Sequence, residues 1–349
     1  MLKSFFAKLK LILKRLIGKL VYIYTYLKGY LPIFIKKIQQ KDTSASAFIS
    51  SLIKEWKLSS LVFFGIIVLY YGLGAFVSSS INNTLNKEIK IDQSTERYAT
   101  VSVIYALKSQ IDDTPWTPSL PLIFPASILD NLPSFQQGSK SATLNIIKKL
   151  SGLYLDKSLK NASQLLNYPE NIWLFSQNED DKLSPGSAKQ YRKALGEIKN
   201  FSKTEAVRFP LSPSNLIYQL DAINTILSNQ TEQIEKHVLE HNTDLTDLKA
   251  DNLFYRTQGV LYTIHYYLSG LTKDYQDLIV EKDLYEDVTT ALQSLNKAIN
   301  LKPFIVKNSS LEDIYGANHL MYLAFYISKT QNILTTISAT IKDSTPKEQ

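Results

Sequence analysis

The sequence contains no cysteine, and this absence excludes several kinds of site at once. Disulfide bonds, thiolate nucleophiles, zinc–thiolate centres and iron–sulfur ligation all need that side chain. Glycine is also scarce, at 12 of 349 residues, and neither glycine-rich phosphate-binding pattern, GxxxxGK[ST] or GxGxxG, occurs. The GxSxG turn of many serine hydrolases is missing as well. The sequence therefore gives no sign of nucleotide binding or thiol chemistry, and we expect no cofactor.

Positive charge is confined largely to the start of the chain. Residues 1–57 hold 12 lysines and arginines against 2 acidic residues, which leaves 27 and 30 for the remainder. The net charge of +7 thus comes from the first segment, whereas a nucleic-acid-binding domain would carry its basic stripe on the folded part. We expect no nucleic-acid partner and interpret the basic segment as a tail beside a membrane.

Charged residues are absent between Lys57 and Lys87, and residues 58–80 read LSSLVFFGIIVLYYGLGAFVSSS. A helix of this length can cross a hydrocarbon core of roughly 30 Å. The alternative is a core helix of a soluble protein. The basic residues before the span predict a cytoplasmic N-terminus, and the position of the span predicts an uncleaved anchor rather than a signal peptide.

Residues 1–40 alternate apolar and basic side chains in a pattern typical of a helix lying in the membrane surface. The cations expected to meet anionic lipid headgroups are Lys8, Lys10, Lys14, Arg15 and Lys19. Residues 20–35 are nearly apolar, which leaves a second membrane-embedded segment as an alternative, although Lys28 lies near the middle. Residues 41–57 read as a polar linker.

Residues 81–349 show helical rather than alternating periods, so we predict an all-α (mainly helical) extracytoplasmic domain behind one transmembrane helix and a basic amphipathic N-terminal helix. In residues 213–247, Ser212 and Pro213 supply an N-cap followed by proline at the first helical position. The segment 112–138, which contains five prolines, is predicted to be irregular. The predicted helices are 92–111, 139–155, 187–201, 213–247, 251–271, 274–300 and 317–341.

The four histidines are the first candidates for a site. His237 and His241 fall in the letters HVLEH, which match the HxxEH pattern of some zinc peptidases. No third ligand is identifiable, and the surrounding residues are polar, so an exposed histidine pair is the simpler interpretation. His265 and His319 are the other two, and each is interpreted as a structural histidine or as a weak catalytic candidate together with Asp130.

Four segments resemble, in order, the bacterial domain of unknown function 2333 family. Residues 128–138 (ILDNLPSFQQG) resemble its DN-P-W/F-G element, and residues 172–192 resemble its tryptophan, proline-serine and glutamate-tyrosine-arginine run. Residues 254–259 (FYRTQG) are similar to its FYEARG element, followed by His265 and the pair Asp274-Tyr275. Residues 316–328 resemble its ANHS…YIS helix.

The sequence departs from that family at several of these positions. The glutamate and arginine of FYEARG are Arg256 and Gln258 here, and the serine after the ANH element is Leu320. The family carries no established activity, so the resemblance implies a membrane-anchored bacterial envelope protein and no reaction. The resemblance also draws attention to a set of polar residues. We interpret them either as a ligand site or as a structural network that fixes helix packing; they are Asp130, Asn131, His265, Asn318 and His319.

Three hypotheses follow. The first is a non-enzymatic protein of the bacterial inner membrane that presents a periplasmic domain to an envelope protein partner. The second is an envelope hydrolase using His265 and His319 with Asp130, which requires these residues to converge in one cleft. The third is a lipid-binding accessory protein whose helices enclose an apolar cavity.

Overall fold

The computed structural model describes residues 56–85, 87–177, 183–241, 248–303, 306–308 and 318–343. The chain divides into two units, residues 1–69 and residues 70–349. The predictions made for the basic arm 1–40, including its surface cations and the alternative membrane segment 20–35, lie outside the described residues. The same holds for most of the predicted linker 41–57.

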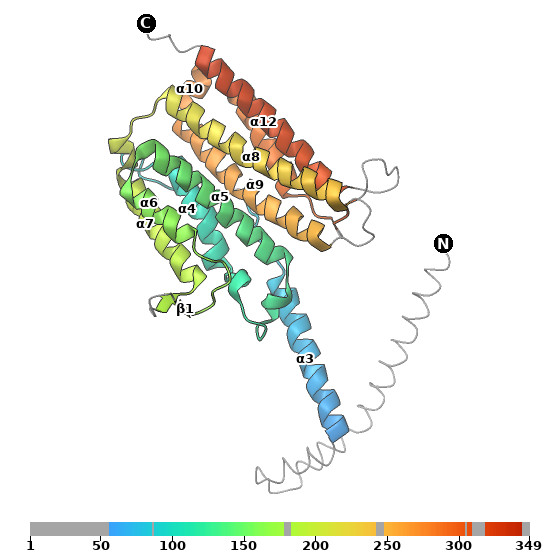
Figure 1. Ribbon diagram of the computed structural model, residues 1–349. Coiled ribbons are helices and arrows are strands. Elements are labelled where there is room, and N and C mark those ends of the chain that lie inside the picture. Colours follow the sequence, from blue (N-terminus) through green and yellow to red (C-terminus); the bar gives the residue numbers. More distant parts are fainter. Residues whose placement is uncertain are drawn as a thin grey trace, which may run out of the picture. The chain divides into compact units, whose positions relative to one another are not determined.

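Helix α3, Trp56–Ser78, corresponds to the predicted span and begins and ends two residues earlier than expected (Figure 1). Within the described part of the chain it is the one helix long and apolar enough to cross a membrane, over Ser60–Ser78. No residue of that window is buried, whereas a core helix of a soluble protein would be. Large apolar side chains such as Phe63 and Phe64 are exposed along it.

Helix α9, Leu248–Asp274, forms the centre of the second unit. Every residue from Thr257 to Ile264 is buried, so the helix is enclosed on all sides rather than along one stripe. It packs against α4 (Tyr98–Lys108), α5 (Asn131–Tyr154) and α11 (Tyr285–Ile299). These contacts make α9 the core around which the other helices assemble.

Two helix pairs complete the unit (Figure 1). Helix α6, Lys157–Leu166, packs on α7, Ser187–Arg208, and this pair contacts α4 and α5. Helix α8, Pro213–His241, packs on α12, His319–Asp343, which also lies against α11. The shorter elements are a π turn at Ser109–Asp113, 3-10 turns at Thr117–Ser119 and Pro125–Ile128, α10 at Gln276–Glu281, and the antiparallel strands β1, Phe175–Gln177, and β2, Leu183–Pro185.

Helices α5 and α9 approach each other through glycine. A Cβ atom at Gly138 would overlap the carbonyl oxygen of Arg256, and one at Gly259 would overlap the carbonyl oxygen of Phe135. The Ser139 hydroxyl lies 2.8 Å from that of Thr263 across the same crossing. Small residues on both helices therefore allow the two backbones to touch. Both glycines end segments that the family resemblance singled out, and here they act in packing.

The mainly helical prediction is confirmed for the domain, and some boundaries follow the sequence closely. Helix α8 begins at Pro213 as predicted, with the Ser212 hydroxyl accepting from the backbone N–H of Asn215 at 3.2 Å. Val238, predicted to lie on the buried stripe of that helix, is 2% exposed. Helix α7 begins at the predicted Ser187 but continues to Arg208.

Helix α4 begins at Tyr98 rather than at the predicted residue 92. The carboxylate of Asp274, at the end of α9, accepts from the backbone N–H groups of Tyr98 and Ala99, both at 2.8 Å. The start of α4 is thus capped by a side chain 175 residues away in sequence. Asp92 forms a turn instead, because its carboxylate accepts from the backbone N–H of Ser94 at 3.1 Å.

Other predicted boundaries were wrong. The single helix expected over 274–300 is broken by Asp283, which has φ 55°, and the Leu284 N–H bonds back to the Ile279 carbonyl at 2.9 Å. Helix α5 begins at Asn131 rather than residue 139, because Pro133 is accommodated in its first turn. Helix α6 and the β1–β2 hairpin were not predicted.

Candidate functional site

Asp130 and Asn131 lie at the start of α5, beside the first turn of α9. In the amide orientation that satisfies its hydrogen bonds, Asn131 donates to the carboxylates of Asp130, at 3.2 Å, and Asp251, at 2.6 Å. Burial, and then the charge of Asp130, raise the pKa of Asp251 to about 6. The bridging amide holds the two acids together and joins the beginnings of α5 and α9.

Asn318 and His319 lie at the start of α12. The Asn318 side chain accepts from the backbone N–H of Met321 at 3.1 Å and so caps the helix. The backbone N–H of His319 donates to the Lys307 carbonyl at 3.0 Å, and its Nδ1 accepts from the Lys307 N–H at 3.0 Å. Burial, and then the charge of Lys307, lower the pKa of His319. These bonds tie residues 306–308 to the helix start.

His265 lies in the middle of α9, where burial lowers its pKa to about 4. It follows Asp251 by 14 residues, which is about 21 Å along the helix axis. Asp130 therefore lies near one end of α9 and His265 well along it. In the part of the chain that is described, no hydrogen bond or ion pair joins Asp130, His265 and His319. The geometry does not bring the hydrolase candidates together.

His237 and His241 share one face of α8. Their rings are stacked, with centroids 4.5 Å apart and planes inclined by 11°. The ring Nδ1 of His241 lies 3.3 Å from the His237 carbonyl oxygen. Across the described ranges, no group of three or more histidine, cysteine, aspartate or glutamate side chains could hold a metal ion. The i, i+4 pair offers two ligands, fewer than a catalytic zinc site uses.

Buried glutamines explain part of the residue pattern at the two glycine-containing segments. Gln136 accepts from the backbone N–H of Thr117 at 2.9 Å and donates to the carbonyls of Gln110 and Pro115 at 2.9 and 3.0 Å. The amide of Gln258 donates to three carbonyl groups at the end of α11, between 2.9 and 3.1 Å. Each buried amide thus forms several hydrogen bonds to backbone groups at a helix end or in a turn.

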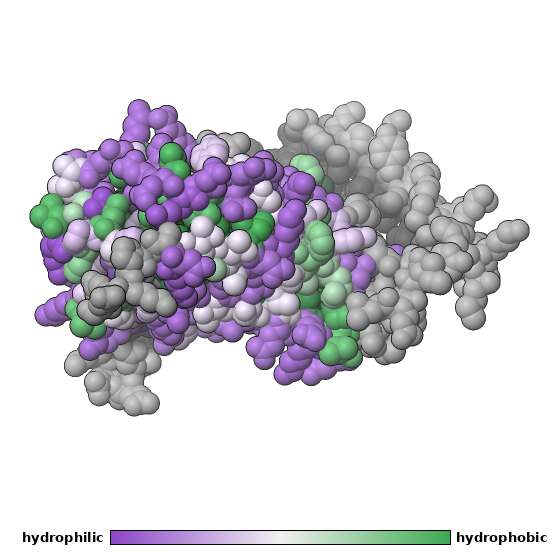
Figure 2. Space-filling model, turned by 90° about the horizontal axis from the view of Figure 1, so that it is seen from above, coloured by the Kyte–Doolittle hydropathy of each residue, from purple (hydrophilic) through white to green (hydrophobic). Residues whose placement is uncertain are grey.

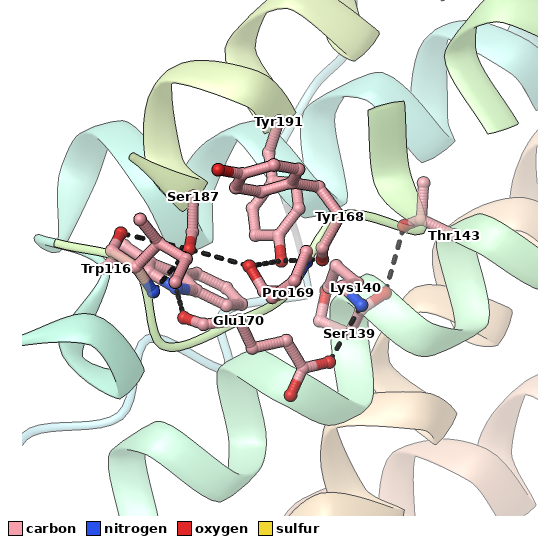
Figure 3. A network of polar contacts seen from close by, with 10 residues as sticks. Trp116, Ser139, Lys140, Thr143, Tyr168, Pro169, Glu170, Ser187 and Tyr191 are labelled. Atoms are coloured by element: carbon pink, nitrogen blue, oxygen red, sulfur yellow. Dashed lines mark hydrogen bonds and ion pairs between the residues drawn. The ribbon is translucent and has the colours of Figure 1, made fainter. Parts of the chain in front are cut away.

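A second polar network holds the loop 168–173 (Figure 3). Tyr191 donates to the Tyr168 carbonyl at 2.8 Å, and Trp116 donates to the Glu170 carbonyl at 2.8 Å. The Glu170 carboxylate forms a 2.8 Å ion pair with the nearly buried Lys140. Side chains from three separate parts of the chain thus fix this loop, and with it the position of the residues that follow.

A third polar cluster lies where α4, α7 and α9 meet. Glu205 is 4% exposed, and burial raises the pKa of its carboxyl to about 8. Asp274 contributes to that shift, while Arg97 opposes it. Burial also raises the pKa of Asp274 to about 6. A polar depression of about 280 Å³ adjoins Arg97 and Asp274 at the surface.

An apolar groove of about 430 Å³ lies between α8 and α12. Its floor consists of Ile234, Val238 and Ala324, which are buried. Leu239 and Phe325 rise at its sides and are 60% and 62% exposed. Polar residues at the margin are Thr231, Glu235 and Ser328. Large apolar side chains that remain exposed beside a preformed groove are typical of a binding site.

The groove was not predicted from the sequence, because its two walls come from helices more than 80 residues apart. Leu239 is the available clue, since it is apolar but follows the buried-stripe residue Val238 on an otherwise polar helix face. Viewed from above, the molecule is mainly hydrophilic with separate apolar patches (Figure 2). The groove is one of the places where large apolar side chains of the domain are exposed.

Comparison with known proteins identified no matching family model, no matching curated protein and no matching solved structure. The resemblance to the domain of unknown function 2333 family therefore stays a prediction.

Proposed function

We propose that this chain is a membrane-anchored envelope protein whose helical domain binds a helical segment of another protein in the groove between α8 and α12. The observation that carries this proposal is the groove itself, with its buried apolar floor and its exposed Leu239 and Phe325. In this proposal α3 crosses the bacterial inner membrane, the basic arm is cytoplasmic and the domain is periplasmic.

The groove dimensions fit a short amphipathic helix. Its lining on α8 runs from Thr231 to Leu239, about 12 Å, and its lining on α12 runs over a similar length from Met321 to Ser328. Two turns of a partner helix would place apolar side chains at i, i+3, i+4 and i+7 against the floor. Met321 supports such binding, because its flexible side chain adapts to different apolar partners.

The test uses tagged full-length protein, purified in gentle detergent from the membranes of its source cells. We expect a defined envelope protein to co-purify, and the double variant Leu239→Glu/Phe325→Glu to retain at least about tenfold less of it. A photo-crosslinking residue at position 325 should attach to an apolar helical segment of that protein. Val207→Glu, at a 71% exposed position on α7, is the matched control and should retain it in full.

Equal loss in the control and in the groove variant would contradict the proposal, as would crosslinks that avoid the groove. A phospholipid lost from the groove variant, with no protein partner affected, would favour the lipid-binding alternative instead. The comparison with the control variant therefore distinguishes binding in the groove from unspecific adhesion to the domain.

A further inference from the structure

Five apolar side chains are exposed on two adjacent segments of the second unit, the loop at residues 121–125 and the chain that leads into β1. We refer to Leu122, Ile123, Trp173, Leu174 and Phe175 as the apolar collar, and their exposed fractions run from 42% to 76%. The two segments are joined by an edge-to-face contact between Phe124 and Trp173, with ring centroids 5.4 Å apart. The network of Figure 3 fixes the loop immediately before Trp173. The collar is therefore an ordered surface rather than scattered side chains.

The collar is attached to the last turns of α3. The Tyr70 hydroxyl donates to the Ile123 carbonyl at 2.9 Å, and the Tyr71 hydroxyl donates to the Leu122 carbonyl. Closer to the end of the helix, a Cβ atom at Gly74 would overlap the side chain of Pro125. All of these residues belong to the second unit. The collar thus lies directly beside residues 70–74.

Residues 70–74 are part of the apolar span, not a stalk beyond it. Tyr70 precedes Ser78, the last residue of α3, by eight residues, or about 12 Å along the axis. A span that ended at Tyr70 would need about 20 residues before it and would then enclose Lys54, Glu55 and Lys57. The charge-free window Ser60–Ser78 avoids this. The collar therefore lies level with the outer part of the bilayer-spanning helix.

Several backbone polar groups of the first collar loop are satisfied within the protein. Backbone polar groups in lipid must be satisfied within the protein. In residues 121–125, both prolines lack an N–H, and the N–H of Phe124 donates to the Pro121 carbonyl at 3.0 Å. The Phe124 carbonyl accepts from the N–H and the hydroxyl of Ser127, at 2.9 and 2.6 Å. The carbonyls of Leu122 and Ile123, which precede Phe124, accept the hydroxyls of Tyr71 and Tyr70 described above.

We propose that the apolar collar inserts into the outer leaflet around α3, so that lipid covers it and the domain is seated on the bilayer. This rests on the proposed anchoring by α3. The occupant is lipid because the collar is continuous with the apolar surface of the helix, where Leu73, Phe76 and Val77 are 63% to 80% exposed. Both surfaces meet the same hydrocarbon.

The absence of cysteine allows a direct test with single labels on full-length protein. Ile123→Cys and Leu174→Cys are each labelled with an environment-sensitive fluorophore and reconstituted into vesicles of phosphatidylcholine and phosphatidylglycerol. We expect a blue-shifted emission, quenched at least about threefold more by a spin label on the lipid chain than by aqueous iodide. Lys160→Cys, exposed on α6, is the aqueous control and should show the reverse.

Quenching of the collar labels by iodide and not by lipid would overturn the proposal. Shielding from both quenchers would overturn it as well, because a second copy or a partner protein would then cover the collar. Val68→Cys, at a lipid-facing position of α3, reports on the anchoring itself. If Val68 is quenched by lipid and the collar is not, the collar proposal alone fails. If neither is quenched by lipid, the proposed anchoring fails.

Discussion

Replacing Gly259 by alanine is expected to destabilise the helical domain by about 3 kcal/mol or more. The added Cβ would overlap the backbone of Phe135, and backbone cannot move aside as a flexible side chain can. Helices α5 and α9 would have to separate along the most central contact of the fold. The measurement is chemical unfolding of full-length protein in detergent, followed by far-ultraviolet circular dichroism.

Gly196→Ala provides the matched control. Gly196 lies in the interior of α7 with no atom within 4 Å of the position of a Cβ, so alanine there should stabilise the helix by about 0.5–1 kcal/mol. Gly138→Ala should destabilise the domain by a similar amount. The double variant should lose less free energy of unfolding than the sum of the two single variants, because one separation of α5 from α9 relieves both overlaps. A Gly259→Ala variant as stable as wild type would contradict the close contact between the backbones of α5 and α9.

Glu205→Gln is expected to remove most of the loss of stability that wild-type protein shows as pH rises. Burial raises the pKa of Glu205 from 4.5 to about 8, so the folded domain keeps a proton that the unfolded chain releases. The contribution of Glu205 to the free energy of unfolding is therefore fully present below about pH 4.5 and is lost progressively up to about pH 8. The shift corresponds to a loss on the order of 5 kcal/mol. Glutamine resembles the protonated acid and has no proton to lose.

Denaturant unfolding at pH 5 and pH 9 tests this expectation. The Glu205→Gln variant should match wild type within about 1 kcal/mol at pH 5 and exceed it by several kcal/mol at pH 9. A smaller slope should persist in the variant, because Asp274 also has a raised pKa. Glu232→Gln, on the exposed face of α8, should leave the wild-type curve unchanged. Parallel curves for wild type and Glu205→Gln would show that Glu205 ionises freely in the folded domain.

Sequence reasoning was most successful where local chemistry decides the structure. The Ser212-Pro213 pair fixed the start of α8, and the charge-free run located α3 to within two residues at each end. Hydrophobic periodicity also identified α7, α9 and α12, although each extends beyond or begins beside the predicted bounds. In all of these, the residues that determine the element lie within it or next to it.

Sequence reasoning failed where residues far apart in the sequence, or tertiary packing, determine where an element begins or ends. The start of α4 depends on Asp274, a cap from another helix that no local pattern reveals. The break between α10 and α11 is a second case, because Asp283 adopts a positive φ although it is not glycine, and a single helix was predicted over 274–300. Here tertiary packing overrides the local preference, so the sequence carries no terminator to find.

The same contrast applies to the candidate sites. The sequence drew attention to Asp130, Asn131, His265, Asn318 and His319. The structure places the first two in a network at the start of α5 and the last two in another at the start of α12, whereas His265 lies buried within α9. The groove and the apolar collar arise from surfaces that meet only in the folded domain. The only sequence clue to the groove was the apolar Leu239, and the only clue to the collar was the apolar, proline-rich segment 112–138. Neither clue indicated which other residues would lie beside it.

The central claim is that α3 anchors the helical domain on the side of the membrane opposite the basic arm. Single cysteines at Ser44, before the span, and Lys160, in the domain, test it in intact bacterial cells with a maleimide that passes the outer but not the inner membrane. We predict that Lys160→Cys is labelled in intact cells, whereas Ser44→Cys is labelled only after the inner membrane is opened. Equal labelling of both positions before opening, or release of the protein by a carbonate wash, would contradict the claim.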